Sequence, residues 1–239
     1  FEEEDNVFLA TRKGKCVRFP VTDVRVFSGR TSKGVRGINL ADGDEVIAMA
    51  GLKHIKTEVA VRDEYLRAVN AGRRLAGGDY TDRDEDKARD EELAAALDQP
   101  EFAEMGEEEE FILTVTADGM GKRTSAYDYR ISKRGGKGID SIDLKRGKYD
   151  PTTVVATLPV LPTDELVMVS DGGQLIRMPV DGISFTGRTA RGVTLFRVND
   201  DEKVVSISRI RDVDGDDENG ESAPEEAPEE TQEDTPAEE

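Results

Sequence analysis

The chain has 239 residues, a formal net charge of −19, one Cys, one His and no Trp. This length allows one or two ordinary domains, and a lone cysteine excludes an intrachain disulfide and fits a reducing cytoplasm. No apolar run approaches the roughly 20 residues that span a bilayer. Taken whole, the charge argues against nucleic-acid binding, because phosphate repels an acidic chain.

The acidic residues are concentrated in three segments, however. Residues 1–5, 54–110 and 212–239 carry net charges of −4, −10 and −14, and the remaining residues together carry +9. The protein is therefore a basic body with acidic attachments, and this asymmetry is the first indication of function.

In chain order, the first element is one of three copies of a unit of about 45 residues. The copies share an Arg, at Arg18, Arg123 and Arg177, followed 15 or 16 residues later by a Gly, at Gly34, Gly138 and Gly192. Because position 1 is Phe, we expect further copies to precede this chain. We predict repeat units at 1–53, 111–157 and 158–211, an acidic insertion at 54–110 and an acidic tail at 212–239.

Each copy has the pattern of four short strands. Apolar, β-branched runs such as Phe111–Thr116 and Leu166–Ser170 are followed at once by Asp-Gly, which is the strongest short signal for a hairpin. A returning strand, a basic loop, an alternating run and a closing strand complete the unit. Four strands in this length predict an all-β, propeller-like fold with three blades.

The insertion between the first two copies has helical spacing. Val61, Tyr65, Leu66 and Val69 recur on one face, and Leu93, Ala96 and Leu97 recur after a glycine-rich break. We predict a hairpin of two short helices. It is either a tolerated surface insertion, which we favour, or an arm that docks a partner.

The tail 212–239 is rich in Pro, Glu and Asp and has no aromatic residue, which predicts disorder. Beside a basic body, its negative charge is either a solubilising extension or a competitor for the surface that binds DNA.

The only Cys and the only His offer little chemistry. Cys16 lies in a strand-like run and is interpreted as a small buried hydrophobe, and His54 as a surface residue without the neighbours that a metal site needs. We therefore expect no catalytic residue, no metal site and no cofactor in this chain.

One basic, glycine-rich loop recurs in each copy, at 28–36, 132–138 and 186–192. Glycine allows close approach of the backbone, so amides and cations can both contact phosphate oxygens without reading bases. The alternative is that the glycines form tight turns and the cations are simply solvated. The candidate DNA-binding residues are Lys15, Arg18, Arg30, Lys33, Arg36, Lys122, Arg123, Lys133, Arg134, Lys137, Arg177, Arg188 and Arg191.

These motifs resemble a known family. The runs at 14–19, 31–40 and 119–124 are similar to the C-terminal domain of the DNA gyrase A protein, a type IIA topoisomerase component, and the resemblance covers all three repeats. It implies a six-bladed β-pinwheel that wraps double-stranded DNA around its rim, of which this chain is the last three blades. It also implies a homodimer of gyrase A joined by regions outside this chain, and an A2B2 heterotetramer with gyrase B. That complex would use ATP and Mg²⁺, through gyrase B, for negative supercoiling in the cytoplasm, on the chromosome.

Two features depart from the family. Its wrapping motif resembles Gln-Arg-Arg-Gly-Gly-Lys-Gly and belongs to the first blade, whereas 132–138 lies in a later repeat and lacks the opening Gln-Arg. The acidic insertion is not a general family feature. Two alternatives stay open: the corresponding C-terminal domain of topoisomerase IV, which the tail and the Arg-Gly-Gly-Lys-Gly segment disfavour, and a protein-binding propeller scaffold.

Overall fold

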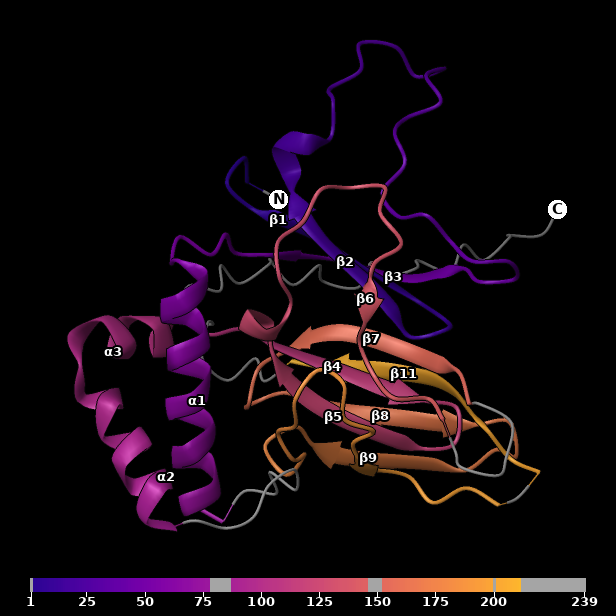
Figure 1. Ribbon diagram of the computed structural model, residues 1–239. Coiled ribbons are helices and arrows are strands. Elements are labelled where there is room, and N and C mark those ends of the chain that lie inside the picture. The colour runs from indigo at the N-terminus through magenta and orange to yellow at the C-terminus, as the bar shows by residue number, and fades with distance from the viewer. Residues whose placement is uncertain (1, 78–86, 146–151, 200, 212–239) are drawn as a thin grey trace, which may run out of the picture.

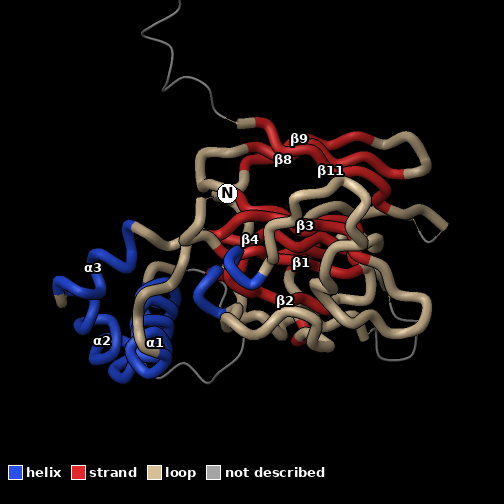
Figure 2. The backbone as a smooth tube through the Cα atoms, turned by 90° about the horizontal axis from the view of Figure 1, so that it is seen from above, coloured by secondary structure: helices blue, strands red, loops and turns tan. Residues whose placement is uncertain are grey.

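The computed structural model describes residues 2–77, 87–145, 152–199 and 201–211. Each of the three repeats supplies three strands of one antiparallel sheet, and the helices of the insertion lie to one side of the sheets (Figures 1 and 2). The predicted all-β fold with a helical insertion is confirmed. None of the helices in these ranges is long and apolar enough to cross a membrane.

Every sheet is built around a hairpin closed by the same turn. In each repeat, a glycine amide donates to the carbonyl three residues earlier: Gly14 to Thr11 at 3.0 Å and Gly119 to Thr116 at 2.9 Å, with Gly173 bonded to Ser170 in the same way. These glycines have φ of 73°, 78° and 84°, a conformation that is costly for any residue with a Cβ atom. The hairpins predicted from Asp-Gly therefore form where the sequence placed them.

A third strand from the end of the repeat pairs with the first hairpin strand in every sheet, as the closing runs predicted. The sheet orders are β3-β1-β2-β6, β10-β5-β4-β7 and β11-β8-β9. The strand bounds are β1 Asn6–Thr11, β2 Lys15–Pro20, β3 Val46–Leu52, β4 Phe111–Thr116, β5 Met120–Ser125, β6 Ile139–Asp140, β7 Val154–Val160, β8 Glu165–Ser170, β9 Leu175–Pro179, β10 Val193–Thr194 and β11 Val204–Ile210.

The fourth strand of a sheet comes from the following repeat, which the sequence did not reveal. Strand β6 belongs to the second repeat but pairs with β2 of the first, and β10 belongs to the third repeat but pairs with β5 of the second. Among the described residues, the third sheet has three strands, and β9 forms its edge. A blade with four strands is thus completed by its neighbour and not by its own repeat.

Neighbouring sheets pack against each other through apolar side chains. Phe8 and Ile112 contribute to the core between the first and second sheets, where the rings of Phe8 and Tyr129 are 5.0 Å apart. Leu113 and Met168 contribute to the core between the second and third sheets. All of these side chains are almost fully buried, so the sheets form one continuous packed body.

The insertion is helical, as predicted, but it contains more than a hairpin of two short helices. Helix α1 has 17 residues, and the side chain of Arg74 on it binds Asp90 on α2 through two hydrogen bonds. The second predicted segment is divided between α2, a 3₁₀ turn and a further helix that begins at Pro100, a residue favoured in a first turn. The helix bounds are α1 Val59–Leu75, α2 Lys87–Ala94, η2 Ala95–Asp98 and α3 Pro100–Glu107; two further 3₁₀ turns are η1 Val21–Asp23 and η3 Ala126–Asp128. The predicted disordered tail, 212–239, lies outside the described residues.

Candidate nucleic-acid interface

The basic loops lie in three connectors, which we define as residues 21–40, 130–145 and 184–198 of the successive repeats. Each connector leaves the hairpin of its own repeat, and the second and third run along the preceding blade. In the second and third connectors, Gly138 and Gly192 have φ of 74° and 87° and lie against the backbone of the preceding blade. Glycine is needed there because a Cβ atom would come within 2.6 Å of the Cys16 oxygen or 2.3 Å of the Gly121 oxygen.

Neighbouring connectors contact each other directly. The Asn39 amide donates to the Gly136 carbonyl at 2.8 Å, and Arg134 donates to the carbonyls of Asp23 and Arg36 at 2.9 and 3.2 Å. These bonds join the first connector to the second.

The second and third connectors are joined in the same way. The side chain of Arg188 donates to the Asp140 carbonyl, and the Asp143 amide donates to the Ala190 carbonyl at 3.4 Å. The three basic loops, which are far apart in the sequence, therefore form one continuous strip.

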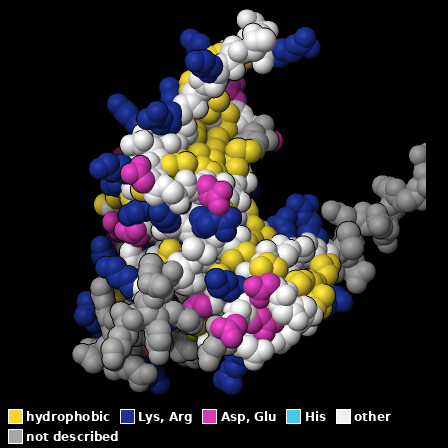
Figure 3. Space-filling model, turned by 90° about the vertical axis from the view of Figure 1, so that its right-hand side faces the viewer, with side chains coloured by type: hydrophobic (Ala, Val, Ile, Leu, Met, Phe, Trp, Pro, Cys, Tyr) yellow, Lys and Arg dark blue, Asp and Glu magenta, His cyan; other side chains and the backbone are white. Residues whose placement is uncertain are grey.

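The exposed cations of this strip are free to bind an external anion. Lys and Arg side chains are spread along one side of the molecule, with fewer Asp and Glu among them (Figure 3). Within the part of the chain that the structure describes, all three connectors carry exposed Lys or Arg side chains that have no hydrogen-bond or ion-pair partner. They are Arg25, Arg30, Lys33, Arg130, Lys133, Lys137, Lys145, Arg191 and Arg197.

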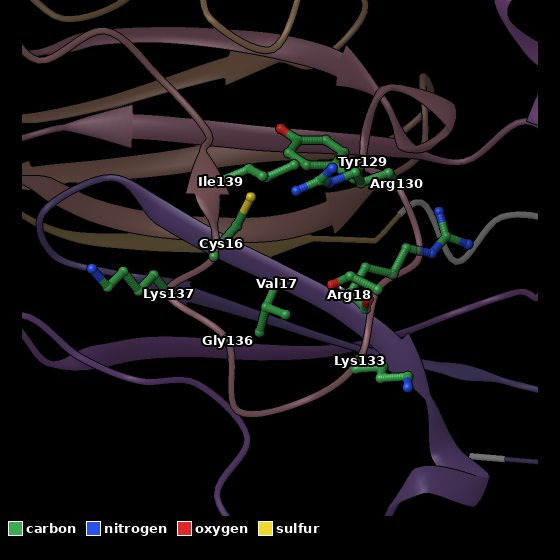
Figure 4. A pocket seen from close by; sticks show the side chains of 11 residues that line it. Cys16, Val17, Arg18, Tyr129, Arg130, Lys133, Gly136, Lys137 and Ile139 are labelled. Carbon is green, nitrogen blue, oxygen red and sulfur yellow. Dashed lines mark hydrogen bonds between the residues drawn. The ribbon is translucent and has the colours of Figure 1, made fainter.

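A hollow of about 150 Å³ lies where the second connector crosses β2. Cys16 and Tyr129 are among the residues that line it, and Lys133 and Lys137 extend from the connector in different directions (Figure 4). Arg130 also lines the hollow and is exposed. The sequence prediction did not include Arg130, although it lies two residues before the basic loop 132–138 and could have been included on that ground.

Three predicted DNA-binding residues are wrong, because they are buried. Arg18, Lys122 and Arg123 are 2%, 0% and 5% exposed. Arg18 and Arg123 do occupy one equivalent repeat position, but the side chain at that position points into the junction between two blades. A duplex on the surface cannot reach these charges.

The charged groups of these residues instead bond to the next repeat. Arg18 donates to the Ala126 carbonyl at 2.8 Å, and Lys122 donates to the Gly187 carbonyl at 2.8 Å. Arg123 donates to the carbonyls of Ile183 and Asp181 at 2.6 and 2.7 Å. Burial lowers the pKa of Arg18 and of Arg123 to about 10, so both stay charged at neutral pH.

The other predicted residues lie in several environments. Arg36 and Arg134 lie within the strip, where Arg134 is half-buried, and Lys15 is paired with Asp140 at 2.6 Å. Arg177 is exposed on the open edge of the third sheet, paired with Glu165. Whether any of these side chains contacts DNA stays a prediction.

Cys16 and His54 lie where the sequence predicts, one buried and the other at the surface. Cys16 is 1% exposed, and burial raises its pKa to about 12, so the thiolate is not available as a nucleophile. His54 is exposed. Among the described residues, no group of three or more His, Cys, Asp or Glu side chains is placed to hold a metal ion.

A family model described as the DNA gyrase C-terminal domain, beta-propeller, matches residues 5–51, 110–149 and 164–211. These three ranges correspond to the three repeats, and they leave out residues 52–109, which contain the insertion.

Curated relatives resemble nearly the whole chain. It is 46% identical to the DNA gyrase A protein of Granulibacter bethesdensis over 92% of this chain and 24% of that protein. It is 34% identical to that of Haemophilus influenzae over 92% of this chain and 22% of that protein. The chain spans about a quarter of the length of these relatives.

Solved structures share the fold. The structure of the DNA gyrase A C-terminal domain has a TM-score of 0.57 and 22% identity, covering 87% of this chain and 51% of that one. The C-terminal domain of DNA topoisomerase IV has a TM-score of 0.58 and 15% identity over 87% of this chain and 47% of that one.

Proposed function

Because the chain belongs to the DNA gyrase C-terminal domain, beta-propeller family, we propose that its connectors bind the backbone of double-stranded DNA and guide the duplex around the blades. One observation supports this most strongly. Three connectors contact each other in series, and each presents exposed cations without an internal partner. Such a strip binds DNA phosphates and does not read the bases, because cations on glycine-rich loops contact the DNA backbone and do not enter a groove of the duplex.

The acidic net charge does not oppose this proposal. Most of the excess negative charge lies in residues 54–110 and 212–239, outside the connectors. Local potential at the strip, rather than the total charge, determines how the surface attracts phosphate, because exposed charges are screened within about 8–10 Å in physiological salt.

In the whole protein, we propose that this part supports ATP-dependent negative supercoiling. A gyrase A dimer would carry two such DNA-guiding surfaces, and gyrase B, in an A2B2 heterotetramer, would bind and hydrolyse ATP with Mg²⁺. The resemblance of the chain to curated gyrase A proteins supports this assignment. A cytoplasmic, chromosome-associated location follows from the same assignment.

The test is the salt dependence of binding to a linear duplex long enough to contact all three connectors. For the parent chain, log K should fall linearly with log salt, with a slope of about −0.9 for each neutralised phosphate. The double variant Lys133→Gln, Lys137→Gln should bind more weakly and show a slope flatter by about 2.

The matched control is the double variant Lys56→Gln, Arg67→Gln. It removes the same amount of charge from exposed positions in the insertion, so its salt slope should equal that of the parent. Equal slopes for all three chains would contradict binding by the connectors.

Wrapping is tested separately from binding. Closed circular DNA is relaxed by an unrelated topoisomerase in the presence of the chain, and the change in linking number is measured. A shift that grows with protein concentration supports guiding of the duplex around the blades. Binding without a shift would favour the alternative of a topoisomerase IV-type domain that binds DNA without wrapping it strongly.

A further inference from the structure

The helical insertion, which the family model leaves out, contacts two successive blade junctions. One side of α1 packs against α3 and against the second blade: the ring of Tyr65 lies 5.6 Å from that of Phe102 and 5.5 Å from that of Tyr127. Tyr127 also donates a hydrogen bond from its hydroxyl to the Met105 carbonyl at 3.0 Å. The insertion is therefore firmly packed on the body, with an interface more extensive than a surface loop requires.

At the first of these junctions, the insertion packs beside the second connector. Ile131 is the connector residue that bridges to Arg18 of the preceding blade, and it packs against the apolar cluster of the insertion. Arg18 also donates to the Lys53 carbonyl, directly before the insertion begins. The Lys53 amide in turn donates to the Glu110 carboxylate at 2.8 Å, where the insertion ends.

At the second junction, the insertion reaches the equivalent position of the third connector. Phe185 corresponds to Ile131 and bridges to Arg123 of the second blade. The guanidinium groups of Arg73, on α1, and of Arg123 lie 4.2 and 4.0 Å from the centroid of the Phe185 ring. One ring of the third repeat is thus held by a cation from the blade and a cation from the insertion.

Arg73 is itself held in place. Its guanidinium donates to Glu109 at 2.7 Å, and the two side chains are only 16% and 3% exposed. The same Glu109 oxygen accepts a hydrogen bond from the Tyr65 hydroxyl at 2.9 Å, which links the two contact points through one carboxylate. Tyr65 and Arg73 are separated by about 12 Å along the rigid axis of α1.

We propose that the insertion is a brace that fixes the angle between successive blades, and that Arg73 is its positioning residue at the second junction. A single rigid helix that contacts both junctions restricts how far one blade can rotate relative to the next. Under the proposed function, on which this role depends, the brace sets the curvature of the strip that the duplex follows.

The brace is tested on the full chain without DNA, by measuring the distance between two spin labels. Cysteines replace Met49 in the first blade and Leu175 in the third, which are 66% and 64% exposed, whereas the buried Cys16 does not react. In the parent, the distance distribution should be narrow. Arg73→Ala should broaden it, and Arg67→Ala, an exposed position on the same helix, should leave it unchanged.

The width of this distribution separates positioning from simple stabilisation. If Arg73 only stabilises the fold, replacing it increases the population of unfolded chain. The distance distribution of the folded chain then stays as narrow as in the parent. A narrow distribution for folded Arg73→Ala would therefore overturn the proposal.

The consequence for DNA is measured with the same variants. Arg73→Ala should bind a short duplex as the parent does, but should bend a long, end-labelled duplex less, as measured by energy transfer between its ends. Unchanged bending would overturn the role in curvature. A parent chain that does not bind DNA would overturn the proposed function. The distances between the spin labels would still decide whether the insertion is a brace.

Discussion

Arg123 and Arg177 occupy the same position in consecutive repeats and have opposite environments. Arg123 is 5% exposed and donates to two carbonyls of the third repeat, whereas Arg177 has a side chain that is 60% exposed and is paired with Glu165. The difference lies in the neighbour: a connector lies on β5, and among the described residues none lies on β9. An arginine at this position forms structural hydrogen bonds where a connector covers the sheet edge, and it is a surface charge where the edge is open.

The glycines of the connectors differ in the same way. Gly34 and Gly192 have φ of 75° and 87°, but Gly192 lies against the Gly121 oxygen and Gly34 has nothing within 4 Å. The local backbone is therefore set by the repeat sequence, whereas the close contact depends on the presence of a preceding blade. The predictions below test this contrast between covered and open positions.

The largest effect is expected from Arg123→Ala. The buried Ile183 carbonyl and the partly buried Asp181 carbonyl would lose their donor and a cavity would remain beside Phe185, so the free energy of unfolding should fall by about 4 kcal/mol. Arg177→Ala, the matched control, should change it by less than about 1 kcal/mol, because exposed ion pairs contribute little. Denaturant titrations of both variants give the comparison, and equal losses would contradict it.

The next effect is expected from glycine substitution in the connectors. Gly34→Ala should lower the free energy of unfolding by about 1 kcal/mol, because a residue with a Cβ atom is strained in the left-handed region. Gly192→Ala adds an overlap with the Gly121 backbone, which cannot move out of the way as a flexible side chain would, and should cost about 3 kcal/mol. The measurement is the midpoint of unfolding. A Gly34→Ala variant that loses as much as Gly192→Ala would show that the first connector is also covered.

The smallest effect concerns pH. Burial raises the pKa of the Asp128 carboxyl from 3.8 to about 6, whereas the equivalent residue of the first repeat, Asp23, is only partly buried. Because the folded chain holds this proton more tightly than the unfolded chain, the carboxyl contributes most to stability below pH 4. That contribution is lost as the pH rises to about 6.

Asp128→Asn removes this titration while it keeps the shape of the side chain. The stability of the parent relative to the variant should therefore decrease between pH 4 and pH 6 and stay constant above that range. Thermal or denaturant unfolding across these pH values measures it. A difference that increases with pH would show that Lys122 and Arg188, which lower the pKa of this carboxyl, outweigh its burial.

The sequence was sufficient to predict the repeats, their hairpins and the helical character of the insertion, although not its third helix. Hairpins follow from local chemistry, since Asp-Gly turns and alternating strands act over a few residues. The basic loops were found for the same reason. The candidate site was less predictable, because Arg18, Lys122 and Arg123 match the pattern of exposed cations but bond to carbonyls of the next repeat. Periodicity within a repeat carries no information about what covers that repeat.

The sequence by itself determined the composition of each blade, the division into basic body and acidic attachments, and the glycine turns that shape the connectors. Only the tertiary structure decided which strand completes each sheet, which cations are buried and that the insertion contacts two junctions. The physical reason is that the first group depends on residues close together in the chain. The second depends on contacts between residues far apart, such as Arg73 with Phe185 and Gly192 with Gly121, which form only when whole blades pack together.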